Sequence, residues 1–459
     1  MDKNLAHDRA LEKLRQNSAL IAAHSTGSGK TSLAWRAADE IATPKGNTLM
    51  IVPAGLVANM QDTKKKFNFK SNPTILSYER AANASNELAK KAWDLVVFDE
   101  AHRLRNPGTK RVEELKKVIN SSKNTLLLTA DPGYNKPEDI GKLVNIATKG
   151  KVAPGIAMKR EVHVPSFLDR VLKGAKTTVT EELLVPPKDK TALAKYVHVY
   201  NPAKTDKKDL FPGVKEQLVI TPMSKQQRDL YQYYERKLSP ELRWKIKNNI
   251  PATKADAAQL SVFANSFRQI SNGTDAFLKG ASELSPKFTT AISRLKEARK
   301  TTPNFRAVVY SNYLESGLNP YKAELTKQGI PFAEVTGALS AKEKSQAVEN
   351  YNKGKTPILL ISSAGGEGLD LKGTKYIQVL EPHFNRSKIN QVIGRGSRFK
   401  SHIHLPKPEQ TILVEHYLSQ PFKGQTGIDE YLYNSSMAKN EQNTLVLNHA
   451  EKYTIPKAA

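Results

Sequence analysis

Two short segments of the chain hold residues that together could act on a phosphate group. The first is His24-Ser-Thr-Gly-Ser-Gly-Lys30-Thr31, and the second is Asp99-Glu100-Ala101-His102. In the first, backbone N–H groups of a glycine-rich turn and the start of the following helix can face an anion, while a lysine reaches the outer phosphate oxygens. In the second, one carboxylate can hold Mg²⁺ and its neighbour can polarise an attacking water. The two segments predict a nucleotide hydrolase.

The first segment is interpreted as the phosphate loop. Gly27 and Gly29 stand where such a loop needs unusual backbone angles, whereas His24 stands at a position that usually holds glycine. Lys30 is expected on the outer phosphates and Thr31 on Mg²⁺. A glycine-rich surface turn is the alternative, and the acidic segment downstream argues against it. The residues expected to bind ATP here are Thr26, Gly27, Ser28, Gly29, Lys30 and Thr31.

The second segment supplies the remaining catalytic groups on this side. Asp99 is expected to be the second Mg²⁺ ligand, and Glu100 is expected to activate the water. Both follow the apolar, β-branched run Val96-Val97-Phe98. A buried strand that ends in two carboxylates delivers them to the carboxyl edge of a sheet, where α/β proteins bind their ligands.

The elements that must position these residues form an alternating pattern. After an amphipathic helix at about 5–16, apolar runs predict strands at 19–23, 48–52, 74–76, 94–98 and 124–129, with helical segments between them. This alternation indicates a parallel sheet that is covered on both faces. It defines a first domain, residues 1–150.

The next segment, residues 151–300, is basic and punctuated by prolines. It contains 28 basic and 15 acidic residues, an excess of 13 that is half of the chain's total. Helical patterns run over 225–249 and 255–268. Solvated helices would explain many of these charges individually; as a group we expect them to face a phosphate backbone.

A second α/β pattern occupies residues 301–425. Strand-like runs at 307–310, 332–335, 358–361 and 376–380 come with helical segments at about 313–328, 341–353 and 365–370. This half has no phosphate loop of its own, so a second independent nucleotide hydrolase is not expected. Residues 426–459 are expected to form a C-terminal helix and tail.

Two arginines in this half could complete the chemistry. In Gln391-Val-Ile-Gly-Arg395-Gly-Ser-Arg398, positions 391, 395 and 398 fall on one face of a helix. Arginine is always charged and its planar fork matches phosphate oxygens. Gln391, Arg395 and Arg398 are therefore candidate catalytic residues that clamp the transferring phosphoryl group. A solvated basic helix end is the bland alternative.

A glycine-rich turn follows the third strand of this half. Ala364-Gly365-Gly366-Glu367-Gly368-Leu369-Asp370 permits a close backbone approach to a ligand or to a facing domain. Gly368 and Asp370 are added to the residues expected to bind the nucleotide. An ordinary strand-to-helix turn is the alternative.

Composition adds a partner and excludes some classes of site. The chain has 459 residues with 71 Lys and Arg against 45 Asp and Glu, a net charge of +26, which favours a nucleic-acid partner. It has no cysteine, which excludes disulfides and cysteine-ligated zinc. No apolar run is long enough for a membrane span, and the N-terminus does not read as a signal peptide. We expect a cytoplasmic protein, in a host cell if it is viral.

Taken together, these segments resemble superfamily 2 helicases, and the match runs from about residue 5 to 420. HSTGSGKT resembles motif I, DEAH motif II, LTADP motif III, VVYSNY motif IV, SSAGGEGLDL motif V and QVIGRGSR motif VI. The resemblance implies two RecA-like parallel-sheet lobes with an ATP cleft between them and a mostly helical basic insertion. It also implies that His102, Thr129 and Ala130 couple nucleotide hydrolysis to movement.

Within that superfamily the chain looks most like the SWI/SNF-type translocases on double-stranded DNA. Five stretches carry this resemblance: LMIVPAGLVANMQDTKKKF, ILSYE, VVFDEAHRLRNPGTKR, LTADPGYNKPEDIGKLVN and AGGEGLDL. In addition, ITPMSKQQRDLYQYYE followed by FRQISNG looks like the end of a helical protrusion. Motif VI departs from the remodellers, because Ser397 replaces a histidine. That motif and the His24 start of motif I look closer to poxvirus-type and phage-type nucleoside triphosphatases. The upstream glutamine that usually reads adenine has no clear counterpart; His7 and Asp8 stand near its position.

We therefore predict a monomeric, ATP- and Mg²⁺-dependent translocase on double-stranded DNA. A strand-separating helicase on forked DNA or on RNA and a viral-type transcription-associated ATPase remain alternatives. A nucleic-acid-binding protein with a decayed ATPase is a further alternative from a different class.

Overall fold

The computed structural model of the chain describes residues 5–42, 46–134, 138–152, 160–163, 178–181, 192–205, 207–253, 255–278, 284–365 and 368–452. The chain divides into two compact units. Unit 1 comprises Met1–Pro202 and Lys439–Ala459, and unit 2 comprises Ala203–Ala438.

Unit 1 is built on a six-stranded parallel sheet with the strand order β3-β2-β4-β5-β1-β8. Because every neighbouring pair is parallel, the carboxyl ends of all six strands meet at one edge. The strands are β1 Ala19–His24, β2 Thr48–Val52, β3 Thr74–Ser77, β4 Trp93–Asp99, β5 Ser122–Thr129 and β8 Val197–Tyr200.

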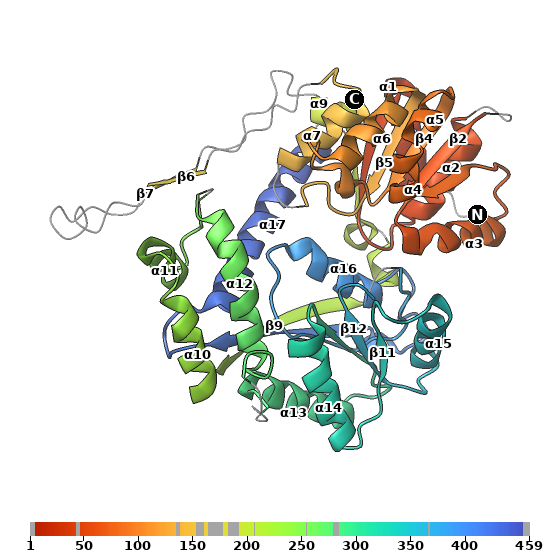
Figure 1. Ribbon diagram of the computed structural model, residues 1–459. Helices are drawn as coiled ribbons and strands as arrows, with labels where there is room; N and C mark the ends of the chain where they lie inside the picture. The colour runs from red at the N-terminus through yellow and green to blue at the C-terminus, as the bar shows by residue number, and fades with distance from the viewer. Residues whose placement is uncertain are drawn as a thin grey trace. The chain divides into compact units, whose positions relative to one another are not determined.

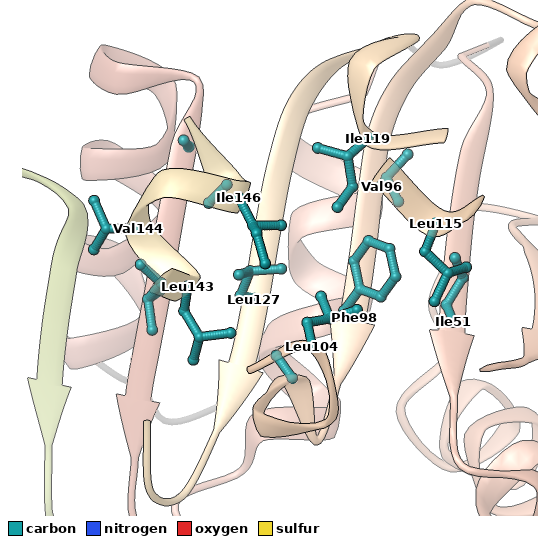
Figure 2. Close-up of a cluster of buried hydrophobic side chains, with 14 of the residues drawn as sticks. Ile51, Val96, Phe98, Leu104, Leu115, Ile119, Leu127, Leu143, Val144 and Ile146 are labelled. Atoms are coloured by element: carbon teal, nitrogen blue, oxygen red, sulfur yellow. The ribbon is translucent and has the colours of Figure 1, made fainter. Parts of the chain in front are cut away.

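Helices cover both faces of this sheet (Figure 1). Successive side chains of a strand point to opposite faces, so Leu20 packs in one core cluster and Ile21 in the other. Figure 2 shows the cluster that contains Ile21, in which Phe98 and Leu127 of the sheet lie beside Leu115 and Leu143 of two helices. The helices of unit 1 are α1 Leu5–Asn17, α2 Lys30–Glu40, α3 Val57–Phe67, α4 Tyr78–Asn83, α5 Ser85–Ala89, α6 Lys110–Asn120, α7 Glu138–Ala147 and α9 Ala192–Tyr196.

Unit 2 contains a second six-stranded parallel sheet with the order β11-β12-β10-β13-β14-β9. Two core clusters again lie on opposite faces, with Val309 in one and Val308 in the other. The strands are β9 Gly213–Pro222, β10 Ala307–Ser311, β11 Ala333–Val335, β12 Ile358–Ser362, β13 Tyr376–Val379 and β14 Thr411–Gln420. The helices against this sheet are α13 Pro286–Thr301, α14 Asn319–Lys327, α15 Ala341–Asn352 and α16 Arg386–Gly396.

A separate helical cluster belongs to unit 2. It consists of α10 Lys225–Glu235, α11 Pro240–Lys247, α12 Ala257–Asn272 and the first turns of α17 Ile428–Lys452. Tyr231 and Phe267 pack at its centre with ring centroids 4.5 Å apart and planes tilted by 36°. Ser239 caps the second helix and Pro240 follows at its first position, which explains why the helical pattern predicted over 225–249 divides into two helices.

The two parallel sheets confirm the predicted α/β class with two RecA-like lobes, while the ATP cleft between them stays a prediction. The four predicted segment boundaries also stay predictions; β8 and β9, which complete the two sheets, lie in the segment interpreted as linker and protrusion. A further pair, β6 Arg160–His163 and β7 Thr178–Glu181, is antiparallel.

One local prediction is wrong. The described part of 365–370 forms turn and irregular backbone instead of a helix, in keeping with its glycines, and Gly366 and Glu367 lie outside the described residues. Across the part of the chain that the structure describes, no helix is long and apolar enough to cross a membrane.

Candidate active site

The phosphate loop connects β1 to α2. Gly27 and Gly29 have φ angles of 78° and 84°, in the left-handed region where a side chain would be strained. Leu33 N–H donates to the carbonyl of Gly29 at 3.0 Å, so the helix starts directly at the end of the loop. The sequence Gly-Ser-Gly-Lys thus adopts the turn that the phosphate interpretation requires.

Lys30 lies within this loop. Its Nζ donates to the carbonyl oxygens of His24 at 3.0 Å and Ser25 at 3.2 Å. Ser28 is buried, and its hydroxyl has no hydrogen-bond partner among the described residues. Thr26 and Thr31 are partly exposed at the two ends of the turn.

The acidic segment lies at the carboxyl end of β4. Asp99 is buried, and its carbonyl accepts a hydrogen bond from the buried Tyr78 hydroxyl at 2.8 Å. One carboxylate oxygen of Asp99 accepts from the backbone N–H of Glu100 at 3.0 Å. Burial and the neighbouring Asp99 carboxylate raise the pKa of Tyr78 well above its usual value, so this hydroxyl stays a donor.

Glu100 has a left-handed backbone, with φ 53° and ψ 47°. A non-glycine residue in this conformation is uncommon and costs free energy unless its surroundings hold it there. One oxygen of the Glu100 carboxylate lies 3.4 Å from Nδ1 of His102. The strained turn therefore separates the directions of two adjacent carboxylates, Asp99 and Glu100.

The residues predicted to couple hydrolysis to movement lie near this turn and on β5. The imidazole of His102 stacks on the ring of Tyr134 at 4.2 Å, and the Arg105 guanidinium lies 4.7 Å from the same ring. Thr129, the last residue of β5, is fully buried and its hydroxyl accepts from Asp131 N–H at 3.2 Å. Ala130 follows it at the edge of the sheet.

Strand order brings these pieces to one place. Strand β5 lies between β4 and β1, with Asp99 in register with Leu128 and Ala23 with Thr129. The phosphate loop, Asp99-Glu100 and Thr129-Ala130 therefore all follow the carboxyl ends of three adjacent strands. This is the edge at which open α/β sheets bind ligands.

The residues present fit a nucleoside triphosphate with Mg²⁺. The glycine turn, the Ser28 hydroxyl and Lys30 provide donors for phosphate oxygens, and Asp99 and Thr31 offer the hard oxygen ligands that Mg²⁺ prefers. No group of three or more His, Asp or Glu among the described residues could hold a metal alone. Such a site would rely on phosphate oxygens and water for the remaining ligands, as is usual for Mg²⁺.

In unit 2, the predicted arginine row is only partly helical. Gln391 and Arg395 lie four residues apart on α16 and share its face, but the helix ends at Gly396. The prediction that Arg398 lies on the same helix is therefore wrong. A Cβ on Gly396 would lie 3.0 Å from the Cβ of Thr374, and this close packing accompanies the helix end.

Arg398 instead lies in the turn after the helix, where its backbone N–H donates to Ser401 Oγ at 3.2 Å. Its guanidinium lies 3.8 Å from the carboxylate of Asp370. Gly368 has a φ of 80°, as expected of a glycine turn, and the Asp370 carbonyl accepts from Asn352 at 2.9 Å. The structure thus joins one residue of predicted motif V to one of motif VI.

Unit 2 also contains a buried polar chain that sequence reasoning missed. Glu381, fully buried, accepts from Ser311 Oγ at 2.9 Å and from Asn272 Nδ2 at 3.0 Å. Lys287 donates to Asn272 Oδ1 at 3.2 Å and to Asp429 at 2.7 Å. This series of hydrogen bonds ties the end of α12 to α13, α17 and the end of β10. Only a charged residue inside an apolar pattern, such as Lys287 before Phe288, hints at it in the sequence.

Two family models match the chain. The SNF2-related domain matches residues 54–276, and the helicase conserved C-terminal domain matches residues 287–400. The first lies mostly over unit 1 and the start of unit 2, and the second lies within unit 2.

Individual relatives have modest identity. A protein of Acanthamoeba polyphaga mimivirus named "Putative ATP-dependent RNA helicase L538" is 29% identical over 96% of this chain and 95% of its own length. The DNA repair and recombination protein RAD54-like of Gallus gallus is 23% identical over 70% of this chain and 46% of its own length. The chain thus spans nearly all of the viral relative and less than half of the RAD54-like protein.

One solved structure aligned with the chain is the Sulfolobus solfataricus SWI2/SNF2 ATPase core in complex with dsDNA. It shares 14% sequence identity, over 97% of this chain and 95% of the other, with a TM-score of 0.37. At this score the fold assignment rests on the two sheets themselves.

Proposed function

The chain belongs to the SNF2-related group of the superfamily 2 helicase-like ATPases, and from that premise we propose that it hydrolyses ATP with Mg²⁺ to move along double-stranded DNA. The observation that carries the proposal is the edge of the unit 1 sheet. There the phosphate loop, the Asp99-Glu100 turn and Thr129 follow three adjacent parallel strands.

In this proposal the loop binds and orients the triphosphate. Lys30 turns from the two loop carbonyls toward the outer phosphate oxygens, and Thr31 and Asp99 would hold Mg²⁺, which would neutralise charge on the phosphates. Glu100 orients the attacking water and accepts its proton. Its left-handed backbone keeps that carboxylate apart from Asp99, so the two carboxylates can have different partners.

We assign to unit 2 the positively charged side chains that clamp the transferring phosphoryl group. Arg395 and Gln391 share one face of α16, and Arg398 follows in the next turn. An arginine that stabilises a transferring phosphoryl group contributes about 10³ to 10⁵ in rate. In this proposal Arg395 and Arg398 act on the transferring phosphoryl group.

The DNA contact is assigned to the basic part of unit 2. On α10, α11 and the turn between them, Arg236 and Lys237 are exposed, and Lys237 Nζ lies 4.2 Å from the ring of the exposed Tyr233. Contacts of cations with phosphates are independent of base sequence and weaken steeply with salt. We therefore expect sequence-independent, salt-sensitive binding.

The ATPase rate tests the proposal when measured in parallel without nucleic acid and with single-stranded DNA, blunt duplex, forked DNA and RNA. Stimulation by blunt duplex supports the translocase. Stimulation by forks or single strands alone would replace it with a strand-separating helicase. Stimulation by RNA alone would favour the RNA reading, which the name of the mimivirus relative raises.

The charge assignment has its own matched test. Arg236→Glu/Lys237→Glu is expected to weaken duplex stimulation and to reduce its salt dependence, while the ATPase rate without DNA stays the same. Lys327→Glu, on an exposed position of α14, is the control because its side chain is 79% exposed outside the helical cluster. An equal effect of both variants would refute the assignment to α10 and α11.

A further inference from the structure

Three histidines are buried behind the phosphate loop of unit 1. His7 lies on α1, His24 ends β1 and His198 lies on β8, and each is at most 5% exposed. They come from parts of the chain that are far apart in sequence. Only the fold brings them together, at the point where the loop begins.

The three rings are in direct contact. Nε2 of His24 lies 2.8 Å from Nδ1 of His198, and the rings of His7 and His24 stack with centroids 5.9 Å apart at an interplanar angle of 15°. Tyr200 packs its edge against His24 at 5.4 Å and His7 at 6.5 Å. These contacts fix the three histidine rings relative to one another.

The elements that hold these histidines contact the loop at two places. Nε2 of His7 donates to the carbonyl of Ser28 at 3.1 Å, and a Cβ on Gly29 would lie 3.2 Å from the His7 ring. Ser25 N–H donates to the carbonyl of Tyr200 at 2.9 Å, and Ser25 Oγ donates to Asn201 at 3.2 Å. Helix α1 thus holds the middle of the loop, and β8 holds its start.

The hydrogen bonds select the tautomers. A carbonyl cannot donate, so His7 carries a proton on Nε2. Nδ1 of His24 is buried without a hydrogen-bond partner among the described residues. An unpaired buried acceptor is less costly than an unpaired buried N–H, so we assign the His24 proton to Nε2, which donates to His198.

The rings are also surrounded by cations. Burial lowers the pKa of His24, and His198, His7 and Lys30 lower it further. Burial lowers the pKa of His198 to about 4, aided by Lys13, His7 and Arg9. His24 and His198 are therefore neutral at physiological pH, and they support the loop without adding charge beneath Lys30.

We propose that His7, His24 and His198 are positioning residues that hold the phosphate loop in the shape that binds a nucleoside triphosphate, and that they thereby set its affinity. This inference rests on the nucleotide-binding part of the proposed function and is independent of the nucleic-acid partner. His24 takes a position where the loop usually has glycine, and the contact with His198 gives that substitution a role.

Matched substitutions separate the hydrogen bonds from mere space filling. Glutamine places an amide N–H close to the position of Nε2, whereas leucine has a similar size and no donor. We expect His7→Leu and His24→Leu each to weaken ATP binding about tenfold, the effect of one buried hydrogen bond. His7→Gln and His24→Gln should recover most of the affinity, and His404→Gln, at an exposed site in unit 2, should have no effect.

The measurements are the dissociation constant of a fluorescent ATP analogue, the KM and kcat of the ATPase, and the melting temperature without nucleotide. Positioning predicts a raised KM with kcat within about twofold, because ground-state binding is lost. Leucine variants that melt earlier but bind as wild type does would overturn the inference. If they do not fold, a glutamine variant with affinity as low as that of His7→Ala would overturn it.

The outcome for the wild-type protein separates the two proposals. A wild-type chain that binds no nucleotide would overturn both the proposed function and this inference. A wild-type chain that binds ATP while all histidine variants bind equally well would overturn the inference alone. A wild-type chain that is not stimulated by duplex DNA, but whose ATP binding is weakened in the leucine variants as predicted, would overturn the translocase and support the inference.

Discussion

Lys30 in unit 1 and Lys287 in unit 2 are both hydrogen-bonded within their units, but in different ways. Lys287 is fully buried and its ammonium lies 2.7 Å from the buried carboxylate of Asp429. Lys30 is partly exposed and donates to two carbonyl oxygens of its own loop. The first charge is compensated within the fold, whereas the second is held by groups that it can exchange for phosphate oxygens.

The comparison extends to the surroundings of each lysine. Around Lys287 a chain of charged and amide groups joins several elements, so its role is to specify how they pack. Around Lys30 the deeper groups are the neutral imidazoles of His24 and His198, and the Asp99 carboxylate lies at the end of β4, two strands away from β1 in the sheet. The charge of Lys287 is buried in a pair that joins packed elements, whereas the charge of Lys30 lies at a sheet edge where a charged ligand is expected.

The largest expected effect on stability comes from breaking the buried pair. Lys287→Met leaves Asp429 charged and buried, which costs about 3–5 kcal/mol. The double variant Lys287→Met/Asp429→Leu should recover most of that loss, because two well-packed apolar residues can replace a buried pair. Urea unfolding followed by Trp244 fluorescence, in a variant with Trp35 and Trp93 replaced by phenylalanine, reports on unit 2.

Lys296→Met on the same helix is the control, because Lys296 is exposed and its removal should change stability by less than about 0.5 kcal/mol. A Lys287→Met protein as stable as this control would show that the buried pair does not hold unit 2 together.

Lys30→Met should give the opposite result. We expect the ATPase rate to fall roughly 10² to 10³-fold, which corresponds to about 2.7–4 kcal/mol of transition-state stabilisation. The free energy of unfolding should change by less than about 0.5 kcal/mol, because a partly exposed side chain is removed without a cavity. An ATPase rate like that of wild type would refute the assignment of Lys30 and revive the reading of a decayed enzyme.

Acidification should weaken unit 1 through its neutral histidines. The pKa of His198 is about 4 in the folded chain and 6.5 ordinarily, so the unfolded chain binds more protons between these values. Stability is therefore complete above pH 6.5 and decreases as the pH falls toward 4. At pH 5 the contribution of His198 to the free energy of unfolding is lower by about 2 kcal/mol than it is above pH 6.5.

Trp35 and Trp93 report on unit 1 when Trp244 is replaced by phenylalanine. Urea titrations at several pH values then give the slope of the free energy of unfolding against pH. His198→Gln should flatten it. Buried His402 of unit 2, whose pKa is also lowered to about 4, should leave the slope of unit 1 unchanged when replaced. A slope in unit 1 that is insensitive to His198→Gln would contradict the prediction.

Much of this arrangement could be predicted from the sequence, because it depends on local patterns. Apolar runs marked the strands around Lys30 and Asp99, and the order of elements placed both at one sheet edge. The predicted strand at 48–52 has those bounds in β2. Periodicity and turn chemistry act over a few residues, so they can be read without knowledge of the fold.

The remainder depended on contacts between distant residues. His198 meets His24 only because the four-residue strand β8 pairs with β1, and so short a run has no distinctive pattern. The helix at Arg395 was expected to include Arg398, but it stops at Gly396, which packs against Thr374. Neither contact leaves a periodic signal in the sequence.

The smallest expected effect on stability concerns strain at Glu100. A left-handed backbone suits asparagine better than glutamate, since the side chain of asparagine bonds locally. Glu100→Asn is therefore expected to raise the free energy of unfolding of unit 1 by up to about 1 kcal/mol, while hydrolysis is lost and ATP binding is kept. Lys400 of unit 2 is the matched position, with a φ of 59°. Lys400→Asn should stabilise to a similar extent with hydrolysis unchanged. Equal loss of hydrolysis in both variants would show that relief of backbone strain anywhere impairs the activity, whereas loss confined to Glu100→Asn would assign the activity to the Glu100 carboxylate in the strained turn of unit 1.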